Sequence, residues 1–392
     1  MDIQQYLSPI SLSALGFFPD EYSMALGTKI TAYTAETGLP AVPQGGLVLL
    51  GAGEDRGAEK NAGCAMAPDE IRRYLYPLAI PTEDTALYDF GNIIVGQDVE
   101  DTYYALSEVL AVLLENNNTV VLLGGSQDLT FAAYKGYERL QRIINITTID
   151  SRFDLDHYDE MTSRTYLKHI IMQNPNYLFL HTNVGYQTYF VGQEYVKLMD
   201  ELKFDAYRVG EVQNDMARAE ALVRNADLLS VDVGSVRQSD APGNCDPSPH
   251  GFYGEELCRM MRFAGMSDKI SCLGMFEVNP MFDNRGQTSH LVAQAVWFFV
   301  EGFFNRKHDS PLLDPQNCKR YIVNLVDQGL EITFYKSKLS DRWWVEVPCE
   351  DVELREIYSR QLILPCTYAD YQQAMNNEVP ALWWRYYQRM NG

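Results

Sequence analysis

Short apolar runs recur along the first three quarters of the chain and alternate with segments of helical spacing. The runs are apolar throughout rather than alternating with polar residues, which is typical of strands covered on both faces. Such a pattern predicts a mostly parallel sheet with helices on both sides. The predicted strands cover residues 47–51, 86–90, 120–123, 143–149, 177–181, 206–209, 228–233 and 270–276.

Two of the intervening segments predict long helices. In residues 98–115, apolar side chains such as Leu106, Leu110 and Leu113 recur at helical spacing. Three consecutive asparagines then end this segment before the next predicted strand. Residues 287–304 form a second long segment, rich in alanine, valine and aromatic residues.

The pattern changes after about residue 306. Strand-like residues 321–325 and 331–335 flank Asp327-Gln328-Gly329, a turn signal between paired strands. A third strand is expected at 342–347, and two short helices are expected at 367–375 and 381–390. We therefore expect a small α+β appendage at 307–392, a main domain at 46–306 and an N-terminal extension at 1–45. The less regular extension either wraps the domain or contacts another subunit.

Two tryptophan pairs lie in the appendage, Trp343-Trp344 and Trp383-Trp384. A packed small core or a docking face explains them better than a ligand cage.

Composition narrows the classes of partner. The formal net charge is -21, so the surface repels phosphate backbones and anionic membranes, and we expect no nucleic-acid or membrane binding. The longest apolar runs are too short to span a bilayer. Seven cysteines are scattered without a C-x-x-C pair, which predicts reduced thiols in a cytoplasmic protein.

Three acidic segments each follow a predicted strand: GGSQD (124–128), IDSRFD (149–154) and SVDVGSVRQSDAPG (230–243). Because the carboxyl ends of parallel strands meet at one edge of a sheet, we expect Asp150, Asp154 and Asp232 to lie together. Three ionised carboxylates at short range repel one another, so such a cluster needs a cation or must take up protons.

These segments resemble the arginase, agmatinase and formimidoylglutamase family of ureohydrolases. The family's strand ends read GGDHS, DAHxD and SxDxD, followed by APG and later by EVNP or EINP. This chain has GGSQD, DSRFD, SVDVG, DAPG (240–243) and EVNP (277–280), with GCAMAPDEIRRYL (63–75) and DFGNI (89–93) upstream. The details look closest to an arginase-like bacterial branch labelled formimidoylglutamase. The likeness spans about 47–304 and implies a three-layer α/β fold, with a mostly parallel sheet between helices.

Working members of the family use two bridged manganese ions, and the resemblance implies which positions would hold them. The first site falls on Gln127, Asp150, Asp154 and Asp232. The second site falls on Asp150, Arg152, Asp232 and Gly234. The amide oxygen of glutamine can coordinate a hard cation, but glycine offers no side-chain donor and arginine stays cationic.

We therefore expect Arg152 to place its guanidinium where the second metal would lie. The three aspartates and Arg152 carry a formal charge of -3 + 1 = -2, which one divalent ion neutralises. The prediction is at most one divalent metal (manganese, magnesium or calcium), or none, with Arg152 forming salt bridges.

Further roles are implied by the resemblance. Glu277 matches a glutamate that contacts the substrate, with a structural salt bridge as the alternative. The family's substrate loop falls near Ser163 and Arg164, where the arginine replaces a small glycine. His157 and His169 are candidates for a proton-shuttling histidine or, alternatively, are surface or packing residues.

The leading hypothesis is a ureohydrolase homologue with a degenerate binuclear site, catalytically impaired, which binds a ligand, regulates or scaffolds. The alternative is a metal-dependent hydrolase of a linear amidine or guanidine, in which Glu277 and Asp154 would be catalytic. The expected partner is an amidine-like small molecule or a protein, and the resemblance implies a homo-oligomer.

Overall fold

A mostly parallel sheet of ten strands forms the centre of the molecule in the computed structural model, which describes residues 3–21 and 23–392. The strand order is β1-β4-β3-β5-β10-β9-β6-β7-β8, with β2 beside β4 and with β1 antiparallel to β4. The strands are β1 (Leu7–Ser8), β2 (Ile30–Ala32), β3 (Leu47–Ala52), β4 (Leu87–Ile93), β5 (Thr119–Gly124), β6 (Ile144–Ile149), β7 (Leu178–Tyr186), β8 (Asp205–Arg208), β9 (Leu228–Asp232) and β10 (Cys272–Phe276).

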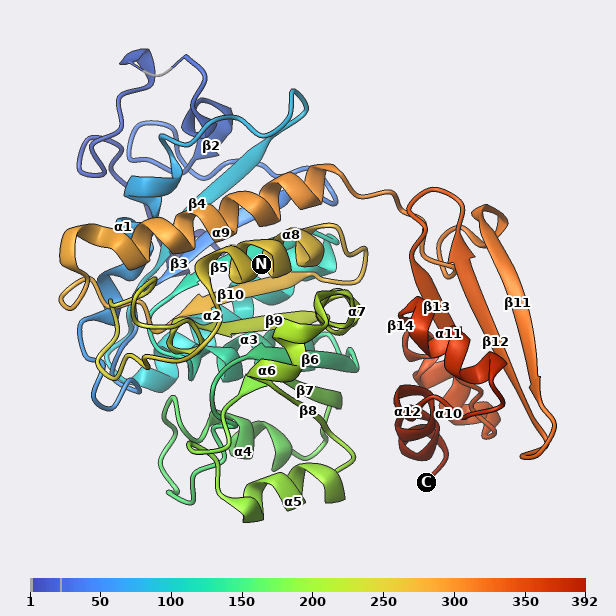
Figure 1. Cartoon of the computed structure of the whole chain (residues 1–392). Coiled ribbons are helices and arrows are strands. Elements are labelled where there is room, and N and C mark those ends of the chain that lie inside the picture. The colour runs from blue at the N-terminus through green and yellow to red at the C-terminus, as the bar shows by residue number, and fades with distance from the viewer. Residues whose placement is uncertain (1–2, 22) are drawn as a thin grey trace.

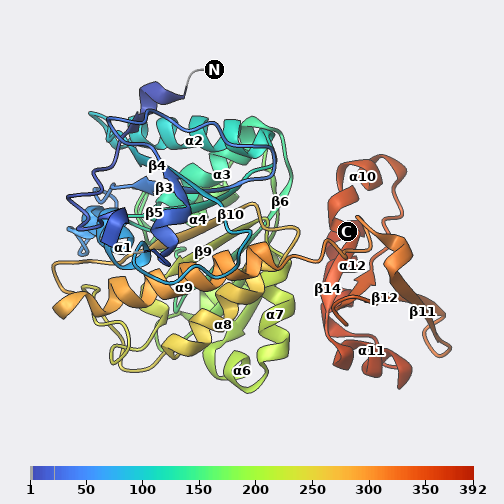
Figure 2. The same ribbon diagram turned by 90° about the horizontal axis from the view of Figure 1, so that it is seen from above.

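Helices cover both faces of this sheet (Figures 1 and 2). One face packs against α2 (Val99–Glu115), α3 (Leu129–Arg139), α4 (Tyr166–Ile171) and α5 (Gln193–Glu201). The other packs against α1 (Ala67–Leu75), α6 (Val209–Asn214), α7 (Met216–Arg224), α8 (Gly254–Gly265) and α9 (Gln287–Phe304).

Successive residues of each central strand supply two separate hydrophobic cores. In β5, Val120 and Leu122 belong to the core under α2 and α3, whereas Val121 and Leu123 belong to the core under α1, α8 and α9. All four are fully buried, which explains why the strand is apolar at every position. The predicted three-layer α/β fold class is confirmed.

The N-terminal segment lies along the edge of the sheet. Leu7 pairs with Ile93, and Ile30 pairs with Leu87, so β1 and β2 both attach to β4. Residues 1, 2 and 22 of the expected 1–45 extension lie outside the described residues.

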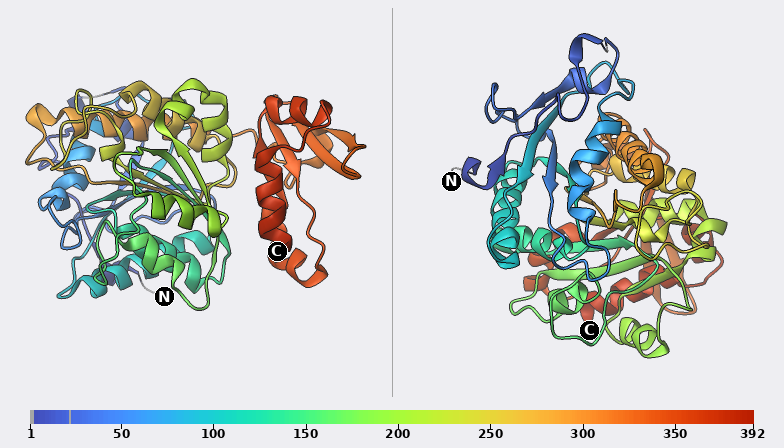
Figure 3. Two further views of the ribbon diagram at one scale, coloured as in Figure 1. Left: turned by 60° about the horizontal axis from the view of Figure 1, so that its bottom comes forward. Right: turned by 90° about the vertical axis from the view of Figure 1, so that its left-hand side faces the viewer.

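Beyond α9 the chain forms a second, antiparallel sheet of four strands, clearly separate from the main sheet in Figures 1 and 3. The predicted small α+β appendage is therefore present. Its elements are β11 (Cys318–Leu325), β12 (Leu330–Ser337), β13 (Trp343–Glu346), α10 (Val352–Ile357), β14 (Ile363–Cys366), α11 (Tyr368–Met375) and α12 (Ala381–Asn391). Three of the four tryptophans are buried, and Trp384 is 43% exposed.

The appendage packs against the amino ends of the main strands. The hydroxyl of Tyr386 on α12 accepts hydrogen bonds from the amides of Asn145 (2.9 Å) and Asn225 (3.3 Å), which lie at the starts of β6 and β9. Arg360 forms an ion pair with Asp227, just before β9. The carboxyl ends of the strands therefore stay clear of the appendage. No described helix has the length and apolar character that crossing a membrane requires.

Candidate functional site

Four neighbouring strands bring the acidic segments to one edge of the sheet. The strands β5, β10, β9 and β6 are adjacent and parallel. Gln127 follows β5, Glu277 follows β10, Asp232 ends β9 and Asp150 follows β6. The carboxyl edge of an open α/β sheet is where such folds hold their ligands.

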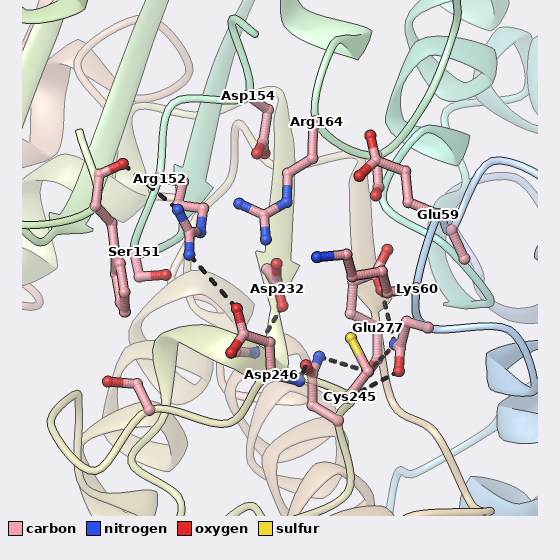
Figure 4. Close-up of a pocket in the computed structure, with 17 residues that line it drawn as sticks. Glu59, Lys60, Ser151, Arg152, Asp154, Arg164, Asp232, Cys245, Asp246 and Glu277 are labelled. Atoms are coloured by element: carbon pink, nitrogen blue, oxygen red, sulfur yellow. Dashed lines mark hydrogen bonds and ion pairs between the residues drawn. The ribbon is translucent and has the colours of Figure 1, made fainter. Parts of the chain in front are cut away.

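A pocket of about 100 Å³ opens at this edge (Figure 4). Many of the residues singled out in the sequence line it: Arg152, Asp154, Ser163, Arg164, Asp232, Gly234 and Glu277. Gln127 and Asp150 are buried beneath its floor, with 1% of each residue exposed.

The segments that carry the site residues show close backbone packing at one position and a strained backbone at two others. A Cβ on Gly125 would lie 1.9 Å from the carbonyl oxygen of Glu54, so only glycine fits this turn. Asp154 and Glu277 have φ values of 52° and 64°, in the left-handed region that non-glycine residues rarely adopt. Strained non-glycine residues cluster at functional sites, so both outliers support a functional origin for this edge.

The three aspartates lie close enough to perturb one another. Burial raises the pKa of Asp154 well above its ordinary value, and the charge of Asp150 raises it further. Burial and the charge of Asp150 raise the pKa of Asp232 to about 7. Asp150 accepts a 2.8 Å hydrogen bond from the backbone N–H of Arg152, while its buried Oδ2 has no conventional donor.

Glu277 is held by neutral donors. Its Oε1 accepts from the backbone N–H of Gln127 (2.8 Å), and its Oε2 accepts from Nδ2 of Asn61 (2.8 Å). It forms no ion pair with any residue that the structure describes, so the salt-bridge alternative is not observed. Burial, followed by the charge of Asp232, raises the pKa of Glu277 well above its ordinary value.

The side chain of Gln127 is fixed from one end. Its Nε2 donates to the hydroxyl of Ser230 (2.9 Å) and more weakly to that of Tyr166 (3.4 Å). Its Oε1 is buried without a donor. This amide oxygen is therefore a neutral acceptor that remains open beneath the pocket.

Arg152 lies differently from expectation. Its guanidinium stacks over the ring of Phe190 at 4.1 Å from the ring centroid and forms an ion pair with Asp246 at 3.6 Å. No ion pair joins it to the three aspartates in residues 3–21 and 23–392. Cation–π stacking and a partly exposed carboxylate outside the cluster hold this side chain at the pocket wall.

Arg164 is the cation that the aspartates influence most. Burial disfavours its charge, but the charges of Asp154, Asp150 and Asp232 outweigh burial and raise its pKa. Figure 4 shows its guanidinium extending into the pocket between Asp154 and Asp232. The neighbouring Ser163 is buried, and its backbone N–H donates to the carbonyl of Gly57 (2.9 Å).

These residues do not fit a pair of metal ions. Among the residues described, no group of three or more His, Cys, Asp or Glu side chains has a geometry that could hold a metal. Gly234 has no donor side chain, and a Cβ at this position would lie 3.0 Å from Oδ1 of Asp232. Two buried oxygens without conventional donors, on Gln127 and Asp150, fall short of the six to eight ligands of a hard cation such as calcium.

Neither candidate histidine lines the pocket. His157 is exposed and stacks on Tyr158 at 4.8 Å between ring centroids. His169 lies on α4, and its Nε2 is buried without a partner.

The sequence interpretation missed several pocket residues, among them Lys60, Asn61, Asn244 and Asp246. The first two lie in the loop that follows β3, a strand that pairs in parallel with β5. Since every parallel strand of this sheet ends at the same edge, that loop was a detectable candidate.

Comparison with known proteins identifies the relatives of this fold and site. The model of the arginase family matches residues 46–300. Formimidoylglutamase from Staphylococcus aureus (strain MSSA476) is 27% identical over 271 residues, which cover 65% of this chain and 86% of that protein.

Solved structures agree on the fold. Formimidoylglutamase from Bacillus subtilis superposes with a TM-score of 0.65 at 17% identity, over 72% of this chain and 93% of that one. Trypanosoma cruzi formiminoglutamase with Mn²⁺ superposes with a TM-score of 0.63 at 20% identity, over 72% and 99%. The chain belongs to the arginase family, and its acidic pocket lies in the part that the family model covers.

Proposed function

We propose that this arginase-family protein binds a small molecule in the pocket and has lost or strongly reduced two-metal hydrolysis. The observation that carries the proposal is the guanidinium of Arg164, which extends into the pocket among the aspartates expected to hold metal. A fixed cation there opposes the binding of further positive charge. Arg152 and Gly234, at the implied second-site positions, supply no ligand.

A metal-dependent hydrolase of a linear amidine or guanidine is the second candidate. Two observations favour it: the open oxygens of Gln127 and Asp150, and the 27% identity to a formimidoylglutamase. One divalent ion is the most that the remaining donors can support. Rates several orders of magnitude lower are then expected, because a single ion lacks the bridged nucleophile of a two-metal site.

Metal content and turnover distinguish the two candidates. The protein should be saturated with Mn²⁺, desalted and analysed for metal, then offered arginine, agmatine, guanidinobutyrate and formiminoglutamate. We expect at most one manganese per chain and no turnover above background. Asp154→Ala tests the pocket, and Asp159→Ala is the matched control, because Asp159 lies in the same loop with a fully exposed side chain.

Turnover that disappears in Asp154→Ala and persists in Asp159→Ala would overturn the proposal in favour of the hydrolase. Two tightly bound manganese ions per chain would do the same. If the appendage docks a partner protein through a tryptophan, the candidate is Trp384, since the other three tryptophans of the appendage are buried. A homo-oligomer stays a prediction from the family resemblance.

A further inference from the structure

Two cationic side chains of the pocket have no partner of their own. The guanidinium of Arg164 and the ammonium of Lys60 form neither a hydrogen bond nor an ion pair with any residue in the described part of the chain. In Figure 4 Arg164 enters the pocket from above and Lys60 from the right, and their charged ends point into the same space. Like charges that face each other favour an anion between them.

Two charged neighbours of these cations, Arg152 and Glu59, are already engaged elsewhere. Arg152 is paired with Asp246, and its guanidinium lies over Phe190. Glu59, beside Lys60 in the chain, accepts a 2.9 Å hydrogen bond from the hydroxyl of Thr162. The carboxylate closest in sequence to Lys60 is therefore held by another residue.

The geometry of the cations and the size of the pocket limit the ligand. A planar guanidinium matches the two oxygens of a carboxylate, which it binds through two parallel hydrogen bonds. A cavity of about 150 Å³ holds a molecule the size of benzene, so this pocket of about 100 Å³ holds a group of only a few non-hydrogen atoms. The carboxyl groups that also line the pocket disfavour a doubly charged anion such as phosphate; they belong to Glu59, Asp154, Asp232, Asp246 and Glu277.

Two hydroxyl groups extend the recognition surface. Ser151 and Ser163 both line the pocket and are buried at 6% and 7% exposure. Neither Oγ takes part in a hydrogen bond within the described residues. Each is free to donate to an oxygen of a ligand held by the cations.

We propose that the pocket binds a small monocarboxylate, with its two oxygens between Arg164 and Lys60. This inference rests on the proposed loss of the two-metal site, since a pair of metal ions would need the same space in the pocket as the carboxylate. It reverses the charge preference of the pocket: the ligand group that enters is an anion and not an amidinium or guanidinium cation.

Isothermal titration of the full chain at constant ionic strength tests the inference. The probes are the sodium salts of acetate and inorganic phosphate, and guanidinium as its chloride. We expect saturable 1:1 binding of acetate, tighter than that of phosphate, and no saturable binding of guanidinium. Arg164→Gln and Lys60→Gln should each weaken acetate binding at least tenfold. Lys197→Gln is the control, because Lys197 is an exposed lysine on α5 outside the pocket.

The outcomes are separable from those of the proposed function. Preferential binding of guanidinium, tighter binding of phosphate, or no saturable binding of acetate would each overturn the carboxylate assignment. An equal loss of affinity in Lys197→Gln would show that general charge, and not the pocket, attracts the anion. Metal content and turnover, measured on the same preparation, decide the proposed function independently.

Discussion

At the scale of single residues, His181 on β7 links the interior of the fold to pH. It is fully buried, and burial lowers the pKa of its ring to about 3 from an ordinary value near 6.5. The ring is therefore neutral in the folded protein and becomes charged on unfolding below about pH 6.5. Its contribution to stability is complete above that pH and is lost as the pH falls toward 3.

This linkage predicts that replacing His181 makes the stability of the protein less sensitive to acid. Each pH unit below the unfolded pKa removes about 1.4 kcal/mol, so lowering the pH from 7 to 4.5 should remove about 3 kcal/mol through His181. Urea unfolding measures the free energy of unfolding at pH 7 and at pH 4.5. The difference between these two free energies should be about 3 kcal/mol smaller in His181→Gln than in the wild type. His157→Gln, at an exposed ring, should leave the difference unchanged. Equal pH dependence in the wild type and His181→Gln would contradict the assignment.

The candidate site shows where reasoning from single residues ends. The sequence placed Asp150, Asp154 and Asp232 at strand ends, and the structure brings them together because β6 and β9 are neighbouring parallel strands. It did not show which arginine enters the cluster. That choice depends on Phe190 and Asp246, which draw Arg152 aside through contacts between separate loops.

At the scale of elements, the fold was largely predictable where strands and helices are long and continuously patterned. The eight predicted strands of the main sheet and the helices α2 and α9 are present with ends within three residues of expectation, except β7, which ends five residues later. The strands β1 and β2 were missed, because two or three residues are too few to show a hydrophobic pattern. Both strands are defined by their pairing with β4. The appendage elements β14 and α10 were missed for a similar reason, since they span only four and six residues.

The contact of α12 with the main sheet is testable at the same scale. Tyr386 is 1% exposed, and its hydroxyl accepts from Asn145 and Asn225. Tyr386→Phe leaves these buried amide groups with one partner fewer and should lower the free energy of unfolding by about 1–2 kcal/mol. Chemical denaturation measures the change. Tyr387→Phe is the matched control on the same helix, because its hydroxyl bonds to exposed Glu350 and should contribute less than about 0.5 kcal/mol.

At the scale of the whole molecule, the pocket and the appendage lie at opposite ends of the same strands. Asn145 and Asn225 mark the amino ends of β6 and β9, and Asp150 and Asp232 mark their carboxyl ends. A six-residue strand such as β6 is about 20 Å long. The appendage therefore supports the sheet that carries the pocket without contributing a residue to it, and stability and binding should respond to different substitutions.

Removal of the appendage tests this division. Asp227 and Asp205 are buried at 0% and 2% exposure and pair with Arg360 (2.9 Å) and Arg385 (3.1 Å) of the appendage. A chain ending at residue 306 loses both arginines and uncovers the apolar surface beneath α12. Asp205, left without its cation, should cost about 1–3 kcal/mol, a large share of a typical stability of 5–15 kcal/mol, whereas Asp227 keeps its ion pair with Lys269 at 3.8 Å. We expect the shortened chain to aggregate or to unfold at a much lower temperature.

Single substitutions keep the test decisive if the shortened chain fails to fold. Arg360→Gln should lower the unfolding temperature, while acetate binding and metal content stay those of the wild type, because Arg360 lies at the far end of the strands. Arg164→Gln should give the converse result, with weak ligand binding and a smaller loss of stability, since the charges of Asp154, Asp150 and Asp232 act on its guanidinium without a direct ion pair among the described residues. If Arg360→Gln weakened ligand binding as strongly as Arg164→Gln, the appendage would be coupled to the pocket and the division into a supporting end and a binding end would be wrong.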